Sequence, residues 1–266
     1  MEGLMPKFDI NARILEQTQL AHSIFLLKVK ASAIMNSANP GQFCMLEVKD
    51  NNSSDPLLRR PLSIYKTRPE GQISFLYKEV GKGTRLLSKR RPGETIRVLG
   101  PLGQGFRLIH GPCMLVGGGL GIASLLLLAE RIKQVGKLII LIGAENASGI
   151  PTIEDFSSLT PYFHVVTEDG GLGQMGMVTD LLAQTLQEIT DIAQIYTCGP
   201  WPMMKAVYHM AYKRNIPCQV SLEANMACGI GLCLGCAVPK SDKQGFLHVC
   251  KEGPVFDADQ VNWEYR

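Results

Sequence analysis

The sequence predicts a multidomain β plus α/β protein with three parts: an antiparallel β-barrel, a parallel-sheet α/β domain and a small C-terminal cysteine-bearing domain. The N-terminal part consists of short strand-like segments between turns, as in a small barrel. The middle alternates apolar strands with amphipathic helices, which indicates a parallel sheet covered on both faces. Four closely spaced cysteines mark the C-terminal part. We expect domains at residues 1–108, 109–216 and 217–266.

Six segments of the first part have the composition of β-strands, with β-branched or alternating apolar residues. Turns rich in Pro and Gly separate several of them. The segments are residues 9–20, 23–31, 41–48, 62–67, 72–80 and 94–100. Within this part, only residues 83–91 have a helical pattern.

The second part predicts strands at 113–119, 137–146, 162–170 and 193–200, and helices at 122–136, 177–189 and 202–215. The apolar run 113–129 contains four glycines, so it is better explained as a strand, a turn and a helix than as a membrane span. The formal net charge of +3 gives no electrostatic reason to expect a nucleic-acid partner. We therefore expect neither nucleic acid nor membrane as a partner.

The most informative pattern is C-x4-C-x2-C-x13-C, formed by Cys228, Cys233, Cys236 and Cys250. Three thiols crowd one Gly-rich loop, as in plant-type 2Fe-2S sites. A structural zinc site is the alternative, although it usually has two short ligand pairs. A disulfide framework is disfavoured, because the chain shows no secretory start and a reducing cytoplasm is the better expectation.

Two corners of the barrel part have residues suited to a diphosphate. Arg60 could supply a charge-assisted fork, with Pro61 fixing the turn and Ser63 facing a ring system. Gly83 and Thr84 open the helical segment, where backbone N–H groups could meet a second phosphate oxygen. An ordinary strand end with solvated arginines is the alternative.

Ligands of parallel sheets bind at the carboxyl ends of the strands. Gly119 and Gly121 would let the backbone approach a diphosphate there, and Glu145 would accept a ribose hydroxyl and favour NAD(H) over a 2′-phosphorylated nucleotide. Cys198, followed by Gly199 and Pro200, is either a packed small residue or a thiol beside the nicotinamide. A solvated loop glutamate is the alternative for Glu145. The five histidines form no catalytic constellation, so we expect no catalytic residue in this chain.

Over essentially its whole length the chain resembles the electron-transfer subunit of the two-subunit, NAD-dependent dihydroorotate dehydrogenase, in the ferredoxin-reductase superfamily. The resemblance rests on RRPLSI, LYKEVGKGT, RVLGPLGQGF, LVGGGLGIA, VTEDGGLGQMGMVTD and YTCGPWPMMKAV, and above all on SLEANMACGIGLCLGCAV and VCKEGPVF. It implies one 2Fe-2S cluster on the four cysteines. It also implies FAD contacts at Arg60, Pro61, Leu62, Ser63, Leu76, Tyr77, Lys78, Gly83 and Thr84. Two positions depart from the family: Ser124 replaces a usual Pro, and Glu145 stands where relatives often have Arg.

The resemblance further implies a cytoplasmic oxidoreductase of pyrimidine (UMP) biosynthesis. A separate FMN-containing catalytic subunit would oxidise dihydroorotate, in a heterotetramer with two copies of each chain. Electrons would pass through the 2Fe-2S cluster and FAD to NAD⁺. This order suits the chemistry, because NAD(H) exchanges two electrons as a hydride and a cluster takes one, so a flavin must stand between them.

Two other functions share these features. The same architecture serves as the small subunit of other NAD(P)H-linked complexes, such as a bifurcating transhydrogenase, a sulfhydrogenase or a dehydrogenase for another substrate. A zinc-stabilised nucleotide-binding module is a non-enzymatic alternative. A brown protein with flavin and iron-sulfur absorption would exclude the module, whereas the partner alone separates the enzymes.

Overall fold

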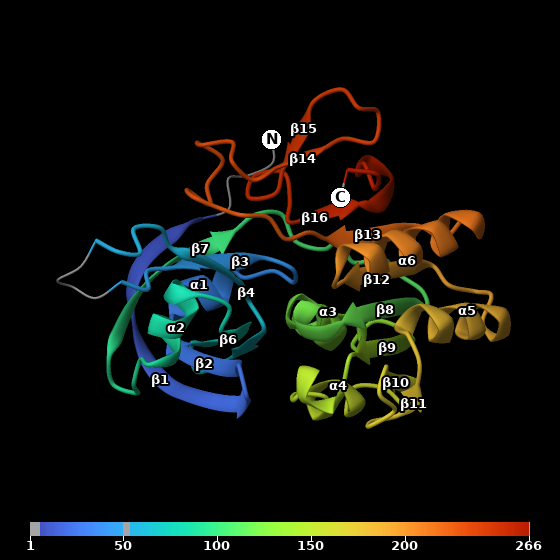
Figure 1. Ribbon diagram of the computed structural model, residues 1–266, viewed down its shortest axis with the longest axis horizontal. Helices are drawn as coiled ribbons and strands as arrows, with labels where there is room; N and C mark the ends of the chain where they lie inside the picture. The colour runs from blue at the N-terminus through green and yellow to red at the C-terminus, as the bar shows by residue number, and fades with distance from the viewer. Residues whose placement is uncertain (1–5, 50–53, 266) are drawn as a thin grey trace.

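The chain contains two seven-stranded β-sheets and a small two-stranded hairpin (Figure 1). The structure is a computed structural model that describes residues 6–49 and 54–265. One sheet forms an antiparallel barrel, and the other is largely parallel and carries helices on both faces. This confirms the predicted fold class. No helix among the described residues combines the length and apolar character needed to cross a membrane.

The barrel sheet has the strand order β4-β3-β7-β1-β2-β6-β5, and every pair in it is antiparallel. Its edge strands β4 and β5 follow each other in the chain. Tyr65, between them, donates its backbone N–H to the carbonyl of Ser74 (2.9 Å), which curls the sheet onto itself. The strands are β1 (Phe8–Ala21), β2 (Ile24–Lys30), β3 (Phe43–Leu46), β4 (Arg60–Ser63), β5 (Lys66–Arg68), β6 (Gln72–Lys78) and β7 (Thr95–Leu102).

Two short helices accompany the barrel, α1 (Ser32–Ser37) and α2 (Lys82–Ser88). The expectation of a single helix in this part was wrong, because α1 was missed. Ile34 is fully buried in the barrel core and holds α1 in place. One buried apolar residue in a six-residue helix leaves no periodic pattern in the sequence, so tertiary packing decides this element.

The second sheet has the order β11-β10-β9-β8-β12-β13-β16, and only β16 runs antiparallel to its neighbour. Strands β13 and β16 lie on either side of the cysteine-bearing segment in the chain. This segment is therefore inserted between two strands of one sheet and contains the hairpin of β14 and β15. The strands are β8 (Cys113–Gly118), β9 (Leu138–Ala144), β10 (Phe163–Thr167), β11 (Gln174–Met175), β12 (Gln194–Cys198), β13 (Cys218–Ser221), β14 (Ala237–Pro239), β15 (Phe246–His248) and β16 (Val255–Asp257). The expected domain boundaries remain predictions.

Helices α3 (Leu126–Ile132) and α4 (Glu154–Ser157) cover the sheet face toward the barrel (Figure 1). Helices α5 (Val178–Glu188) and α6 (Trp201–Lys213) cover the opposite face. The helix expected at 122–136 is shorter than predicted, because the 3₁₀ segment η1 (Gly119–Ser124) precedes α3. Two further 3₁₀ turns are η2 (Ala147–Gly149) and η3 (Ala258–Gln260).

A carboxylate of α4 ties the barrel to the second sheet. Asp155 accepts hydrogen bonds from the hydroxyl of Tyr65 and from the ammonium of Lys66, both at 2.6 Å. Tyr65 is only 1% exposed, so its hydroxyl depends on this acceptor. A second ion pair joins Arg68 to Glu130 of α3 (3.4 Å). These contacts fix how the two sheets face each other.

Asp155→Ala should therefore loosen the contact between the sheets. It leaves the buried Tyr65 hydroxyl without its acceptor, at a cost of about 2 kcal/mol. We expect Tm to fall by several degrees in a calorimetric scan. Glu154→Ala is the matched control, since the side chain of Glu154 makes no hydrogen bond or ion pair among the described residues. An unchanged Tm for Asp155→Ala would show that this carboxylate does not hold the sheets together.

Candidate functional site

Two cavities lie between the barrel and the second sheet. The barrel-side cavity, of about 490 Å³, is bounded by β4, the end of β6, η1 and residues 221–226. The strand-end cavity, of about 520 Å³, is bounded by the carboxyl ends of β8, β9 and β10, the start of α6 and the β1–β2 turn. Lys78 and Leu120 line both cavities. The two spaces therefore adjoin, and a molecule in one can touch a molecule in the other.

The barrel-side cavity gathers most of the residues that the family resemblance implied as FAD contacts. They are Arg60, Pro61, Leu62, Ser63, Leu76, Tyr77, Lys78 and Thr84. Leu76 and Tyr77 are almost fully buried and form part of the wall. Tyr77 stacks on Phe25 at 5.7 Å and accepts a hydrogen bond from the amide of Gln17 (2.5 Å). An apolar wall with a cation and hydroxyls at its rim suits a flat ring attached to a diphosphate.

Arg60 is held at the rim of this cavity by backbone contacts. Its Nη1 donates to the carbonyl oxygen of Leu58 at 2.6 Å. The guanidinium lies against Gly83, where any Cβ would collide with it. Gly83 itself does not line the cavity, so the structure places it behind Arg60. Thr84 closes the start of α2, because its hydroxyl accepts the backbone N–H of Val80 at 2.9 Å.

Cys198 and Gly121 form a tightly packed part of the barrel-side cavity. A Cβ at position 121 would come within 2.5 Å of the carbonyl oxygen of Cys198, so only glycine fits here. Gly121 was expected beside Gly119 but lies in the other cavity. Burial raises the pKa of the Cys198 thiol to about 12, which makes it a packed, protonated group at neutral pH. Ser124, a departure from the family pattern, is buried and donates to the carbonyl of Gly121 (3.0 Å).

Residues 221–226 complete the barrel-side cavity, although no site residue was predicted among them from the sequence. Glu223, Asn225 and Met226 stand just before the first cysteine of the C-x4-C-x2-C loop. Desolvation by the surrounding protein raises the pKa of the Glu223 carboxyl, because it disfavours the charged form. The sequence signal that could have pointed to these residues is their short distance from the cysteine pattern, since Met226 lies only two residues before Cys228. It places the cavity next to the cysteine loop.

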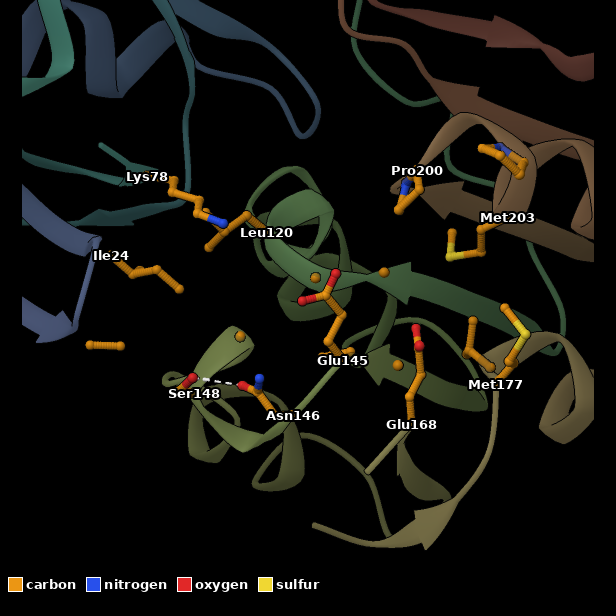
Figure 2. A pocket seen from close by; sticks show the side chains of 18 of the residues that line it. Ile24, Lys78, Leu120, Glu145, Asn146, Ser148, Glu168, Met177, Pro200 and Met203 are labelled. Carbon is orange, nitrogen blue, oxygen red and sulfur yellow. Dashed lines mark hydrogen bonds between the residues drawn. The ribbon is translucent and has the colours of Figure 1, made fainter. Parts of the chain in front are cut away.

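Gly119, Glu145 and Pro200 line the strand-end cavity, and Figure 2 shows Glu145 and Pro200 there. Gly119 has φ +51° and open space above it, so a ligand can approach its backbone closely. Gly199 lines neither cavity and packs against Gly118 and Met203. The sequence placed TEDGG (167–171) at a ligand-binding strand end but gave Glu168 no role of its own. It missed the turn residues His22 and Ser23, which only the fold brings here.

The four cysteines lie in two pairs. The Sγ atoms of Cys236 and Cys250 are 3.2 Å apart. The Sγ of Cys228 accepts the backbone N–H of Cys233 at 3.5 Å and also interacts with the Cys233 side chain. In the described parts of the chain, no group of three Cys, His, Asp or Glu side chains is placed to hold one metal ion. Two thiolates for each of two iron atoms is the ligand arrangement of a 2Fe-2S cluster. The donor set therefore fits that cluster.

Backbone N–H groups surround these thiols, as iron-sulfur sites require. Ile230 donates to the Sγ of Cys228 at 3.5 Å, and Gly231 donates to that of Cys250 at 3.2 Å. Burial alone would raise the pKa of Cys228, but the backbone N–H groups of Cys233 and Ile230 lower it to about 6. Burial and the neighbouring Cys236 raise the pKa of Cys250 to about 12.

The loop around the cysteines is apolar on its outer side. Leu232 is 77% exposed, Leu234 is 55% exposed, and Ile230 is also exposed. On the inner side, Gly229 has φ +71° and packs on Met45 of β3, where a Cβ would come within 2.5 Å of that side chain. The loop therefore rests on the barrel and presents its leucines to the outside.

Sequence comparison matches residues 223–262 to the family model of the iron-sulfur cluster binding domain of dihydroorotate dehydrogenase B. The electron transfer subunit of dihydroorotate dehydrogenase B (NAD(+)) from Caldanaerobacter subterraneus subsp. tengcongensis is 36% identical over 258 residues, covering 96% of this chain and 99% of that protein. The subunit of the same description from Bacillus caldolyticus is 38% identical over 256 residues, covering 93% and 96%.

Solved structures share the fold. The structure of an NADH-dependent reduced ferredoxin-NADP oxidoreductase, described in connection with flavin-based electron bifurcation, superposes with a TM-score of 0.85 at 28% identity, covering 99% of this chain and 92% of that one. A ferredoxin reductase in carbazole 1,9a-dioxygenase superposes with a TM-score of 0.65 at 21% identity, covering 80% and 67%. The second similarity concerns the fold alone.

Proposed function

Because this chain belongs to the family of electron-transfer subunits of dihydroorotate dehydrogenase B (NAD(+)), we propose that it relays electrons between a dihydroorotate-oxidising subunit and NAD⁺ in pyrimidine biosynthesis. It is an oxidoreductase subunit that works with FAD, a 2Fe-2S cluster and NAD(H). The observation that carries this conclusion is identity of 36–38% over 93–96% of the chain, together with the complete cysteine pattern.

We assign FAD to the barrel-side cavity, with Arg60 at its diphosphate and Leu76 and Tyr77 at its ring. NAD(H) is assigned to the strand-end cavity, and the cluster to the two cysteine pairs. This gives FAD mainly to residues 1–108, NAD(H) mainly to 109–216 and the cluster to 217–266. When bound, FAD exchanges a hydride with NAD(H) and single electrons with the cluster. Lys78 and Leu120 support this assignment because they border both cavities, which lets the two ring systems meet.

The partner in this proposal is an FMN-containing catalytic subunit, in a heterotetramer of two copies of each chain. The exposed Leu232 and Leu234 support a docking face at the cysteine loop, since apolar groups at the centre of an interface exclude water. A cytoplasmic location belongs to the same proposal. It is supported by the eight cysteines, all of which are described and none of which forms a disulfide.

A second candidate is the small subunit of an electron-bifurcating enzyme. The similarity to the NADH-dependent reduced ferredoxin-NADP oxidoreductase over 99% of the chain favours it. The higher identity to the dihydroorotate dehydrogenase subunits favours the first candidate. The two differ in the partner and its substrate, so reconstitution with a dihydroorotate dehydrogenase catalytic subunit separates them.

Replacement of a cluster cysteine should separate two activities. Cys233→Ala removes an exposed ligand, so it should spare NADH-dependent reduction of an artificial dye and abolish dihydroorotate-dependent NAD⁺ reduction in the reconstituted complex. Cys218→Ala is the control, because this buried thiol lies outside the cysteine pattern. Normal dihydroorotate-dependent turnover without a cluster would contradict the proposed relay. Failure of the unaltered chain to bind the catalytic subunit would favour the second candidate.

Loss of the Arg60 guanidinium should weaken FAD binding. Removing a charge-assisted contact costs about 2 kcal/mol, or about thirtyfold in affinity, so Arg60→Ala should lose FAD on gel filtration. Gly83→Ala should cause a smaller loss, because the added methyl displaces the guanidinium. Arg59→Ala is the matched control, since Arg59 pairs with Asp9 (3.1 Å) and does not line the cavity. Full FAD occupancy in Arg60→Ala would show that this corner has only a structural role.

A further inference from the structure

The charges of the strand-end cavity are unevenly arranged. Lys78 lies at the border with the barrel-side cavity, whereas Glu145 and Glu168 lie at the ends of β9 and β10 (Figure 2). In the sheet order, β9 and β10 are one and two strands away from β8, whose end carries the glycines of η1. A dinucleotide that extends from the barrel-side cavity along these strand ends would bring its other end to the two acids.

Glu168 is held beside Glu145 by the backbone. Ala144 and Thr167, the last residues of their strands, are register partners in the parallel pair. The N–H of Glu168 donates to the carbonyl of Ala144 at 3.0 Å, and the N–H of Asp169 donates to that of Glu145 at 3.2 Å. These bonds hold the carboxyl ends of β9 and β10 together, so both glutamates extend from the same corner of the sheet.

Neither glutamate carboxylate has a hydrogen-bond or ion-pair partner among residues 6–49 and 54–265. The adjacent Asp169 differs, because its Oδ1 accepts the N–H of Gly171 (2.8 Å) and it does not line the cavity. A ligand that covers Glu145 and Glu168 must offer them donors, since a desolvated carboxylate without a partner is costly. Neutral hydroxyl groups meet this need, whereas phosphate groups do not.

We propose that Glu168 is a second specificity-determining residue for the nucleotide, acting with Glu145 as a pair of acceptors for the adenosine ribose of NAD(H). Each carboxylate takes one hydroxyl of the ribose diol. A 2′-phosphate at this point would face two negative charges instead of one. This inference rests on the proposed function, and it adds that Glu145 alone does not set the preference for NAD(H).

Binding of two redox-inert probes tests the pair. ADP-ribose and 2′-phospho-ADP-ribose are titrated calorimetrically into the FAD-loaded chain and into Glu145→Gln, Glu168→Gln and the double variant. Glutamine keeps the size and an acceptor oxygen but removes the charge. Glu188→Gln is the control, because Glu188 is an exposed glutamate at the end of α5, outside the cavity.

The unaltered chain should bind ADP-ribose more tightly than 2′-phospho-ADP-ribose. Each single variant should narrow this preference by about fivefold, the effect of one like charge near the phosphate, and the double variant should narrow it further. Glu188→Gln should leave it unchanged. If Glu168→Gln keeps the full preference while Glu145→Gln loses it, the role of Glu168 is refuted and the nucleotide site stands. If the unaltered chain binds neither probe, the nucleotide site itself fails.

Discussion

Segment η1 packs between the barrel and the second sheet so closely that both cavities depend on it. Gly121 leaves no room for a side chain against the carbonyl of Cys198, and Leu120 in the same turn borders both cavities. η1 also contacts β6, β8 and β12, so it joins the strands that carry the candidate flavin and nucleotide contacts. A larger residue at 121 would push η1 away from β12 and displace Leu120, which borders both cavities. The proposed hydride transfer needs the two cavities to stay adjoined at this turn.

The cysteine loop is fixed in the same way, by packing rather than by a flexible tether. Strands β13 and β16 anchor both ends of the inserted segment in one sheet. Cys236 and Cys250 belong to a hydrophobic core that also contains Phe43 and Met45 of the barrel. The distance between the cluster site and the barrel-side cavity is therefore set by a buried core. Electron transfer benefits from this rigidity, because its rate depends on the distance between the redox groups and the buried core keeps that distance constant.

Local patterns in the sequence predicted much of this arrangement. Alternating strands, strand–helix alternation and the cysteine spacing led to the fold class and the four thiols, because each pattern is a property of neighbouring residues. The sequence did not predict α1, the early 3₁₀ turn or the proposed role of Glu168. Those features depend on contacts across the fold, such as burial of Ile34 in the barrel core or the pairing of Ala144 with Thr167. Gly121 shows the same limit, since its glycine serves packing against Cys198.

The proposed electron relay requires one chain to hold both a flavin and a two-iron cluster beside a nucleotide site. Cofactor content of the purified, anaerobically prepared chain tests it most directly, by absorption spectroscopy together with analysis of flavin, iron, sulfide and zinc. We predict FAD together with iron and inorganic sulfide, a brown colour, and bleaching of the flavin band on addition of NADH. A colourless chain that contains zinc, or a chain with iron and sulfide but no flavin, would contradict this set of cofactors.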